Sequence, residues 1–190
     1  MRLFVAAYPS AAALDDLADQ VSTMHVGRAA AAGVNARVTA RPLWHLTLAF
    51  LGDVANDRCD DVVGAIEAAA ERFDGQRPMV RLAGGGTFGR GRFALLWVGA
   101  DGDVAGLGSL AGTVRAELRR ARLPFDRKPF RAHLTIARPG DRIPGSDLAD
   151  DVAHLSTYQG PWWTLTEITL VESHLGPHPR HDPLSVRELG

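Results

Sequence analysis

Apolar side chains recur along this chain with two different periods. Alternating or continuous apolar stretches are typical of β-strands, whereas a spacing of three and four residues is typical of amphipathic helices. The first pattern predicts strands at 2–8, 36–39, 44–51, 79–82, 93–98, 133–137 and 162–171. The second predicts helices near 14–24, 59–73, 104–118 and 147–155. From Ser173 the chain is rich in Gly, Pro and His, which indicates an irregular loop ending in at most a short strand.

The order of these elements predicts the fold class. Strands and helices alternate, but some strands also follow one another in hairpin-like pairs. That mixture favours an α+β fold with antiparallel sheets over a doubly wound parallel sheet. A chain of 190 residues is long enough for one well-buried core. We therefore expect residues 1–190 to form a single domain.

One short phrase occurs twice. HLTLAF covers residues 45–50 and HLTIAR covers residues 133–138, so the two copies lie 88 residues apart, close to half the chain. Each follows a predicted helix and a basic-Pro dipeptide, Arg41-Pro42 or Lys128-Pro129. An internal duplication, with two similar lobes that each supply one copy, would explain this arrangement.

Both copies present His and Thr on one face of a predicted strand. Alternate residues of a strand share a face, so His45 and Thr47 point one way while Leu46, Leu48 and Phe50 point the other. The same holds for His133 and Thr135. This alternation also assigns Phe50 and Arg138 to the opposite, back face unless each strand ends there. Packing explains the apolar back but not the repeated polar front, which predicts one shared cleft.

Two facing His-Thr pairs suit displacement at phosphorus. The reaction needs a base on the attacking oxygen and an acid on the leaving oxygen, and imidazole can serve as either near neutral pH. Threonine hydroxyls can donate hydrogen bonds to the non-bridging oxygens, where charge develops. No metal or other cofactor is required. A strained cyclic phosphate would supply the leaving group.

Overall charge and composition exclude several classes of protein. The net charge is −1, which argues against broad non-specific binding to nucleic acid. The segment 115–142, however, contains nine basic residues and only three acidic ones, and it surrounds the second phrase. It is either a solvated basic surface or a local attractor of anions. The single cysteine excludes an internal disulfide, and no apolar run approaches the roughly 20 residues of a membrane span. We expect a cytoplasmic monomer.

Two other motifs match known patterns by letter only. Residues 84–89 read G-x-G-x-x-G, but a dinucleotide fingerprint must lead into a helix, and here a strand follows. A flexible hairpin loop over 84–92 is predicted, from which Arg90 and Arg92 could reach a phosphate. His174, His178 and His181 have helical spacing, but the intervening glycine and prolines forbid a helix, so we predict no metal site.

The chain resembles the 2H phosphoesterase superfamily, and within it the RNA 2′,3′-cyclic phosphodiesterases, also called 2′-5′ RNA ligases. The segments that carry this resemblance cover nearly the whole chain in order: RLFVAAYP, HLTLAFLGDV, FALLWVG, KPFRAHLTIARP and TLTEITLVES. The resemblance implies a two-lobed α+β fold in which two antiparallel sheets frame a central cleft, with helices outside. It also implies metal-independent hydrolysis of a 2′,3′-cyclic phosphate, at an RNA 3′ end or on a small nucleotide, to a 2′-phosphate.

The resemblance also assigns roles by position. His45 would give a proton to the departing 3′ oxygen, and His133 would take one from water. Thr47 and Thr135 would hold the phosphate. Phe50 would stack on a base, and Arg138 would contact a phosphate or ribose. An aromatic residue expected in the tail loop is not evident, because His178 and His181 stand in that region.

Two alternatives remain open at the sequence level. The same cleft could run the reverse reaction, as a 2′-5′ RNA ligase. The chain could instead be a non-catalytic module that binds RNA ends, although binding alone would be served by Arg or Lys in place of the two histidines.

Overall fold

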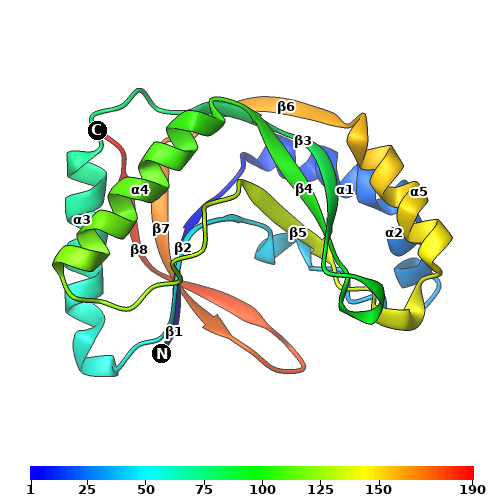
Figure 1. Ribbon diagram of the computed structural model, residues 1–190, viewed down its shortest axis with the longest axis horizontal. Coiled ribbons are helices and arrows are strands. Elements are labelled where there is room, and N and C mark those ends of the chain that lie inside the picture. Colours follow the sequence, from blue (N-terminus) through cyan, green and yellow to red (C-terminus); the bar gives the residue numbers. More distant parts are fainter.

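The computed structural model describes residues 1–190 and contains five α-helices and eight β-strands (Figure 1). The helices are α1 (Ala11–Thr23), α2 (His25–Ala31), α3 (Cys59–Arg72), α4 (Val104–Arg120) and α5 (Gly145–Ser156). The strands are β1 (Arg2–Ala7), β2 (Leu46–Asp53), β3 (Met79–Phe88), β4 (Leu95–Gly102), β5 (His133–Ala137), β6 (Gln159–Thr164), β7 (Glu167–His174) and β8 (Arg180–Glu188).

The strands form two four-stranded antiparallel sheets, so the predicted α+β class is confirmed. The first sheet has the order β2-β1-β7-β8, and the second has the order β5-β4-β3-β6. In each sheet, the strand carrying one His-x-Thr phrase lies at an edge: β2 in the first and β5 in the second. In each sheet, too, that edge strand pairs with the strand that precedes it along the chain, across a helical connection.

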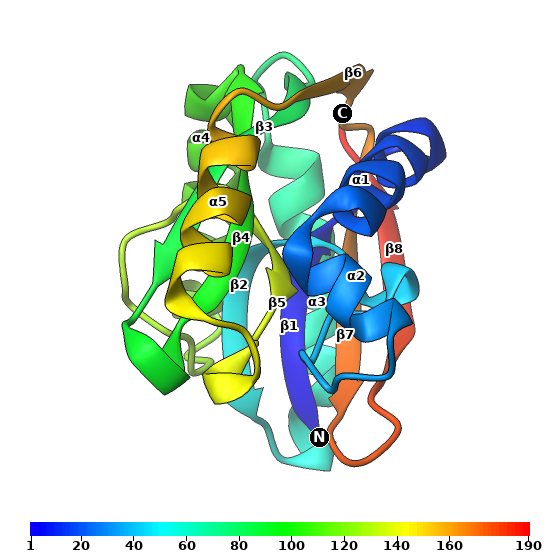
Figure 2. The ribbon, with the colours of Figure 1, turned by 90° about the vertical axis from the view of Figure 1, so that its right-hand side faces the viewer.

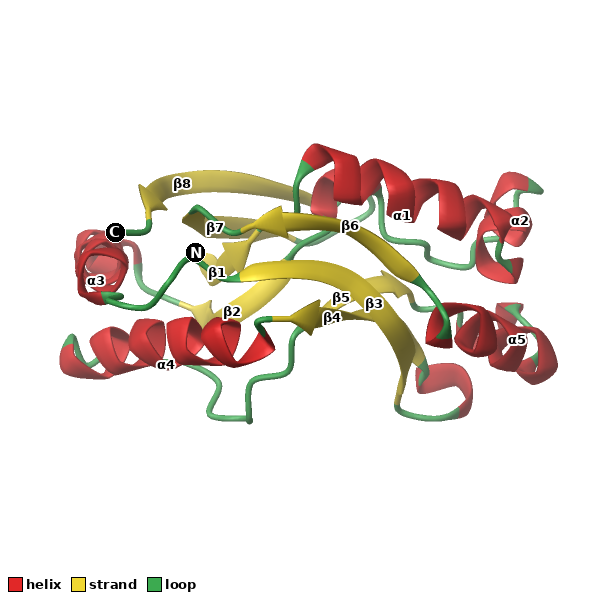
Figure 3. Ribbon diagram, turned by 90° about the horizontal axis from the view of Figure 1, so that it is seen from above, coloured by secondary structure: helices red, strands yellow, loops and turns green.

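The helices cover the outer faces of the sheets. Helices α3 and α4 pack on the first sheet, whereas α1 and α5 pack on the second, at opposite ends of the molecule (Figures 1 and 3). Helix α1 follows β1 of the first sheet but packs on the second sheet, whereas α4 follows β4 of the second sheet but packs on the first. Figure 2 shows α1, α2 and α5 together in front of the strands. Forty-two buried apolar residues from both sheets and their helices form one continuous core.

Three sequence predictions about the strands are wrong. The stretch 162–171 is two strands, because the chain leaves the second sheet at Leu165, whose N–H donates to the carbonyl of Pro78, and enters the first. The tail from Ser173 is not mainly irregular, since β8 pairs with β7 along nearly its whole length. Residues 36–39 form no strand, but Val38 makes a single bridge to Ala137 of β5.

The glycines at 84–86 lie within β3 rather than in the predicted loop. Gly84 takes a left-handed φ of 63° at a shift in register, which is typical of a β-bulge. A Cβ on Gly85 would lie 2.7 Å from the carbonyl oxygen of Trp97, and one on Gly86 would lie 2.9 Å from the Trp97 ring. These glycines therefore allow β4 and its tryptophan to approach closely.

Candidate active site

The two motif histidines make the same backbone hydrogen bond. Nδ1 of His45 lies 2.7 Å from the carbonyl oxygen of Leu43, and Nδ1 of His133 lies 2.8 Å from that of Arg131. A carbonyl can only accept, so Nδ1 carries the proton in both rings and donates it. When either ring is neutral, Nε2 therefore holds the free lone pair. Each imidazole is oriented by the residue two positions before it, and Nε2 is left for a substrate.

A β-bulge follows each His-x-Thr phrase. In β2, Thr47 lies opposite Ala6 and Ala49 opposite Val5, which leaves Leu48 without a partner. In β5, Thr135 lies opposite Trp97 and Ala137 opposite Leu96, which leaves Ile136 without a partner. The two unpaired residues, Leu48 and Ile136, are fully buried. The alanines that follow them, Ala49 and Ala137, are also buried.

The bulge in β2 overturns the predicted facing of Phe50, whereas β5 ends at Ala137, one residue before Arg138. Two consecutive residues point into the core, so the next residue returns to the face that carries Thr. Phe50 lies opposite Phe4, which shares a face with Ala6 and hence with Thr47. Simple alternation failed because it assumes an unbroken ladder of pairs.

A cavity of about 570 Å³ lies between the two sheets. Its lining includes Thr47 and Phe50 from β2, Phe88 from β3 and His133 from β5. The remaining wall comes from α4 and the segment before β5: Arg115, Asp126, Lys128, Pro129, Phe130 and Arg131. The first sheet thus contributes two residues to the cleft, both from β2, and the second sheet contributes one residue each from β3 and β5. His45 and Thr135 do not line this cavity.

Part of the basic segment noted in the sequence faces this cleft. Arg115, Lys128 and Arg131 line it, against a single acidic residue, Asp126. The backbone N–H of Lys128 donates to the Asp126 carboxylate at 3.0 Å, and this bond is the main cause of a lowered pKa of Asp126. Of the two sequence interpretations, the attraction of an anion fits this placement for these three cations.

His45 lies in an aromatic and largely desolvated setting. Its ring stacks on Phe4 with centroids 4.5 Å apart, and the ring of His181 meets it edge-on at 5.1 Å. Burial lowers the pKa of His45 to about 4, with smaller contributions in the same direction from positive charge on His181 and His133, while the Leu43 carbonyl opposes the change. The contribution from His133 means that the two motif histidines are within electrostatic range of each other.

His181 was not predicted to belong to the site. It lies in β8 opposite Ser173 of β7, and its ring also contacts Phe4 at 4.9 Å. Burial lowers its pKa, which the Asp182 carboxylate opposes. The only sequence signal was its place in a tail loop where an aromatic residue was sought.

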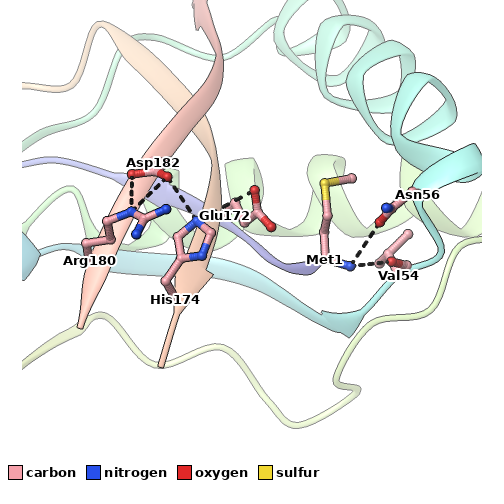
Figure 4. A network of polar contacts seen from close by, with 7 residues as sticks. All are labelled: Met1, Val54, Asn56, Glu172, His174, Arg180 and Asp182. Carbon is pink, nitrogen blue, oxygen red and sulfur yellow. Dashed lines mark hydrogen bonds and ion pairs between the residues drawn. The ribbon is translucent and has the colours of Figure 1, made fainter. Parts of the chain in front are cut away.

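Polar contacts brace the hairpin that carries His181 (Figure 4). Nε2 of His174 lies 2.9 Å from Asp182 and 3.7 Å from Glu172, and Nε of Arg180 lies 3.1 Å from Asp182. The contact between His174 of β7 and Asp182 of β8 joins the two strands next to His181. His174 and His181 thus have different partners, and no group of three or more His, Cys, Asp or Glu side chains is arranged to hold a metal ion.

His133 is surrounded differently. Its ring meets Phe88 edge-on at 4.9 Å and Trp97 at 6.4 Å, and those two aromatic rings stack on each other at 5.1 Å. Gly99 lies opposite His133, and Thr135 lies opposite Trp97 on the same face of β5. Neither Phe88 nor Trp97 was predicted from the sequence, because a single apolar residue in a strand does not reveal which face it occupies.

Arg138 lines a second, smaller pocket of about 280 Å³ beside the cleft. Phe88 lines both. The smaller pocket also contains Arg37, Arg92 and Phe93.

No helix of the molecule combines the length and apolar character needed to cross a membrane.

Comparison with known proteins identifies the family of this chain. The family model described as the 2′-5′ RNA ligase superfamily matches residues 9–177. A segment of 97 residues is 37% identical to an RNA 2′,3′-cyclic phosphodiesterase from Geobacillus stearothermophilus. That alignment spans 50% of this chain and 30% of the relative.

Solved structures share the fold over their whole length. TT0787 of Thermus thermophilus is 25% identical with a TM-score of 0.73, and the match covers 100% of this chain and 98% of that one. LigT of E. coli, solved with NADP+, is 24% identical with a TM-score of 0.71, covering 99% and 96%. The family model covers far more than half of the sequence, and this chain therefore belongs to the 2′-5′ RNA ligase superfamily, the 2H phosphoesterases.

Proposed function

We propose that this protein hydrolyses 2′,3′-cyclic phosphates, at RNA 3′ ends or on nucleosides, to 2′-phosphates by acid–base catalysis between two histidines, without a metal. The observation that carries the proposal is the matched pair of Nδ1–H bonds, which leaves Nε2 free on both His45 and His133. The relative from Geobacillus stearothermophilus, named an RNA 2′,3′-cyclic phosphodiesterase, supports the choice of substrate.

The reaction consumes one water molecule. His133 takes a proton from the water as its oxygen bonds to phosphorus, and His45 gives a proton to the 3′ oxygen as its bond to phosphorus breaks. Thr47 and Thr135 donate hydrogen bonds to the non-bridging oxygens, where negative charge builds. Positioned proton transfer of this kind typically contributes 10²–10⁴-fold to the rate.

His45 must gain a proton before it can act as the acid. With a pKa of about 4 it is neutral in the unliganded site at pH 7. A phosphate anion about 4 Å from the ring would stabilise the imidazolium by about 4 kcal/mol at an effective dielectric constant near 20. That energy raises the pKa by about 3, to near neutrality. The negative charge of the bound substrate thus favours the protonated form of His45, the catalytic acid.

The test is turnover of 2′,3′-cyclic AMP in the presence of EDTA, with the product identified by phosphorus NMR. Wild type should yield 2′-AMP, and His45→Gln and His133→Gln should each lose 10²–10⁴-fold in kcat. His154→Gln is the matched control, because His154 lies on α5 and contacts Gln20 of α1. Full activity in either motif variant, or a 3′-phosphate product, would contradict the proposal.

A second reaction uses the same groups. In 2′-5′ ligation, a 5′-hydroxyl replaces water as the nucleophile, and the same base and acid serve it. The description of the matching family supports this alternative. Adding an RNA with a 5′-hydroxyl to the assay distinguishes the two, because ligation produces a longer RNA. A module that only binds RNA ends would retain binding and turn over neither substrate.

A further inference from the structure

We propose that the pocket lined by Arg37, Arg92, Phe93 and Arg138, which we term the arginine pocket, binds the nucleotide on the 5′ side of the cyclic phosphate. The preferred substrate is then an RNA chain rather than a free cyclic nucleotide. This inference rests on the proposed function and concerns residues outside the two motifs, except for Arg138.

Three guanidinium groups of the arginine pocket lack an acidic partner. Arg37 follows α2, Arg92 lies in the turn between β3 and β4, and Arg138 follows β5, so three separate segments deliver them to one place. None of the three forms an ion pair with a carboxylate, whereas Arg41, Arg58, Arg72, Arg81, Arg120, Arg180 and Arg187 all do. Clustered cations without a counter-charge form a site for an anion, and the guanidinium group matches a phosphate in two-point hydrogen bonding.

An exposed aromatic ring lies beside these cations. The Phe93 side chain is 73% exposed, and the Arg92 guanidinium lies over its ring at 4.8 Å from the centroid. Phe88 contributes a second ring to the same pocket. Aromatic faces next to arginines are the usual means of holding unpaired nucleotides, since the ring stacks on the base and the cation meets the phosphate.

The arginine pocket adjoins the catalytic cleft. Phe88 lines both, and its ring meets that of His133 at 4.9 Å. A chain whose terminal phosphate lies at His133 therefore reaches the arginine pocket by passing Phe88. Arg138 directly follows β5, the strand that begins at His133, so the motif strand leads into the arginine pocket.

The position of Arg37 is fixed by the backbone. Its φ of 48° is left-handed, a conformation that residues other than glycine rarely adopt. Its carbonyl accepts a hydrogen bond from the N–H of Arg138 at 3.2 Å, and the N–H of Thr39 donates to Ile136 at 2.7 Å. Segment 37–39 thus lies along the end of β5 and keeps Arg37 beside Arg138.

The experiment compares 2′,3′-cyclic AMP with the dinucleotide ApA ending in a 2′,3′-cyclic phosphate. Wild type should show at least a tenfold higher kcat/KM on the dinucleotide, because each charged hydrogen bond is worth about tenfold or more. The Arg37→Ala/Arg92→Ala double variant should reduce this preference at least fivefold, and Phe93→Ala should reduce it less. A dinucleotide with an uncharged methylphosphonate linkage should lose the preference in wild type.

Arg90→Ala is the matched control, since Arg90 lies in the same turn but lines a different pocket with Asp141. It should leave the preference unchanged. A preference equal in wild type and the double variant, with both folded by circular dichroism, would overturn the inference.

A binding measurement separates this inference from the proposed function. If wild type hydrolyses neither substrate, the proposed function fails, and the arginine pocket is judged by the affinity of ApA carrying a terminal 2′-phosphate relative to 2′-AMP. Weaker discrimination in the double variant than in wild type supports the pocket. Equal discrimination, or equal displacement of both ligands by free inorganic phosphate, overturns it.

Discussion

The strands β2 and β5 carry the same phrase in two different environments. His45 directly precedes β2 and His133 begins β5; each donates its Nδ1–H to the carbonyl two residues back, and both strands bulge directly after Thr. Yet the ring of His45 stacks on Phe4 and meets the ring of His181 edge-on. Burial at this position disfavours a positive charge on His45. His133 instead borders a cavity lined with Arg115, Lys128 and Arg131. The same local geometry is thus repeated in two different surroundings, and this difference underlies the separate roles that we propose for the two histidines.

The largest expected difference between the two histidines is in the response of His45 to phosphate. An anion in the cleft should raise the pKa of His45 from about 4 toward 7, an effect of about 4 kcal/mol. Imidazole signals followed by NMR between pH 3 and 9, with and without inorganic phosphate, measure it. The resonance of His154 on α5 provides an internal reference. An unchanged titration of His45 at saturating phosphate would contradict the account.

The same pKa predicts how the stability of the fold changes with pH. The folded value of about 4 lies below the ordinary 6.5, so the unfolded chain binds more protons between these limits and the fold loses stability as pH falls from 6.5 to 4. The loss from this group is at most about 3 kcal/mol. Urea unfolding at pH 7 and pH 4.5 should show a smaller drop in His45→Gln than in wild type. An equal drop would mean that His45 is not the cause.

The two threonines should behave alike, in contrast to the histidines. Removing a hydroxyl that donates to charged phosphate oxygens costs about 1.5–3 kcal/mol, or about 10–150-fold in kcat. Thr47→Val and Thr135→Val should both show it, and Thr47→Ser and Thr135→Ser, which keep the hydroxyl, should retain most of the activity. A valine variant with the kcat of wild type would remove that threonine from the mechanism.

His181 should have the smallest effect. His181→Ala removes a neighbouring charge and admits water, and both changes raise the pKa of His45, so the limb of the kcat/KM profile against pH that reports His45 should move upward by less than about one unit. His178→Ala is the matched control, because His178 is exposed on the same hairpin. A purely structural role for His181 would lower activity equally at all pH values.

Much of this comparison was readable from the sequence. Period-two alternation correctly put His and Thr on one face, and it located both strands to within two residues. It failed at Phe50, because a bulge depends on pairing with a neighbouring strand and leaves no mark in local hydrophobicity. The alternation does not extend to Arg138, because β5 ends at Ala137. It also merged β6 and β7, since both are apolar and only their partners in different sheets separate them at Leu165. His181 could not be placed, because its contact with His45 depends on how β8 pairs with β7.

The division of roles between His45 and His133 is tested most directly with a substrate whose 3′ bridging oxygen is replaced by sulfur. A thiolate leaves without help, since a thiol pKa is near 8.5. His45→Gln, slowed about 10²–10⁴-fold on the oxygen substrate, should come within about tenfold of wild type on the sulfur substrate, while His133→Gln remains slow on both. Rescue of His133→Gln instead, or of neither variant, would contradict the assignment of His45 as the acid and His133 as the base.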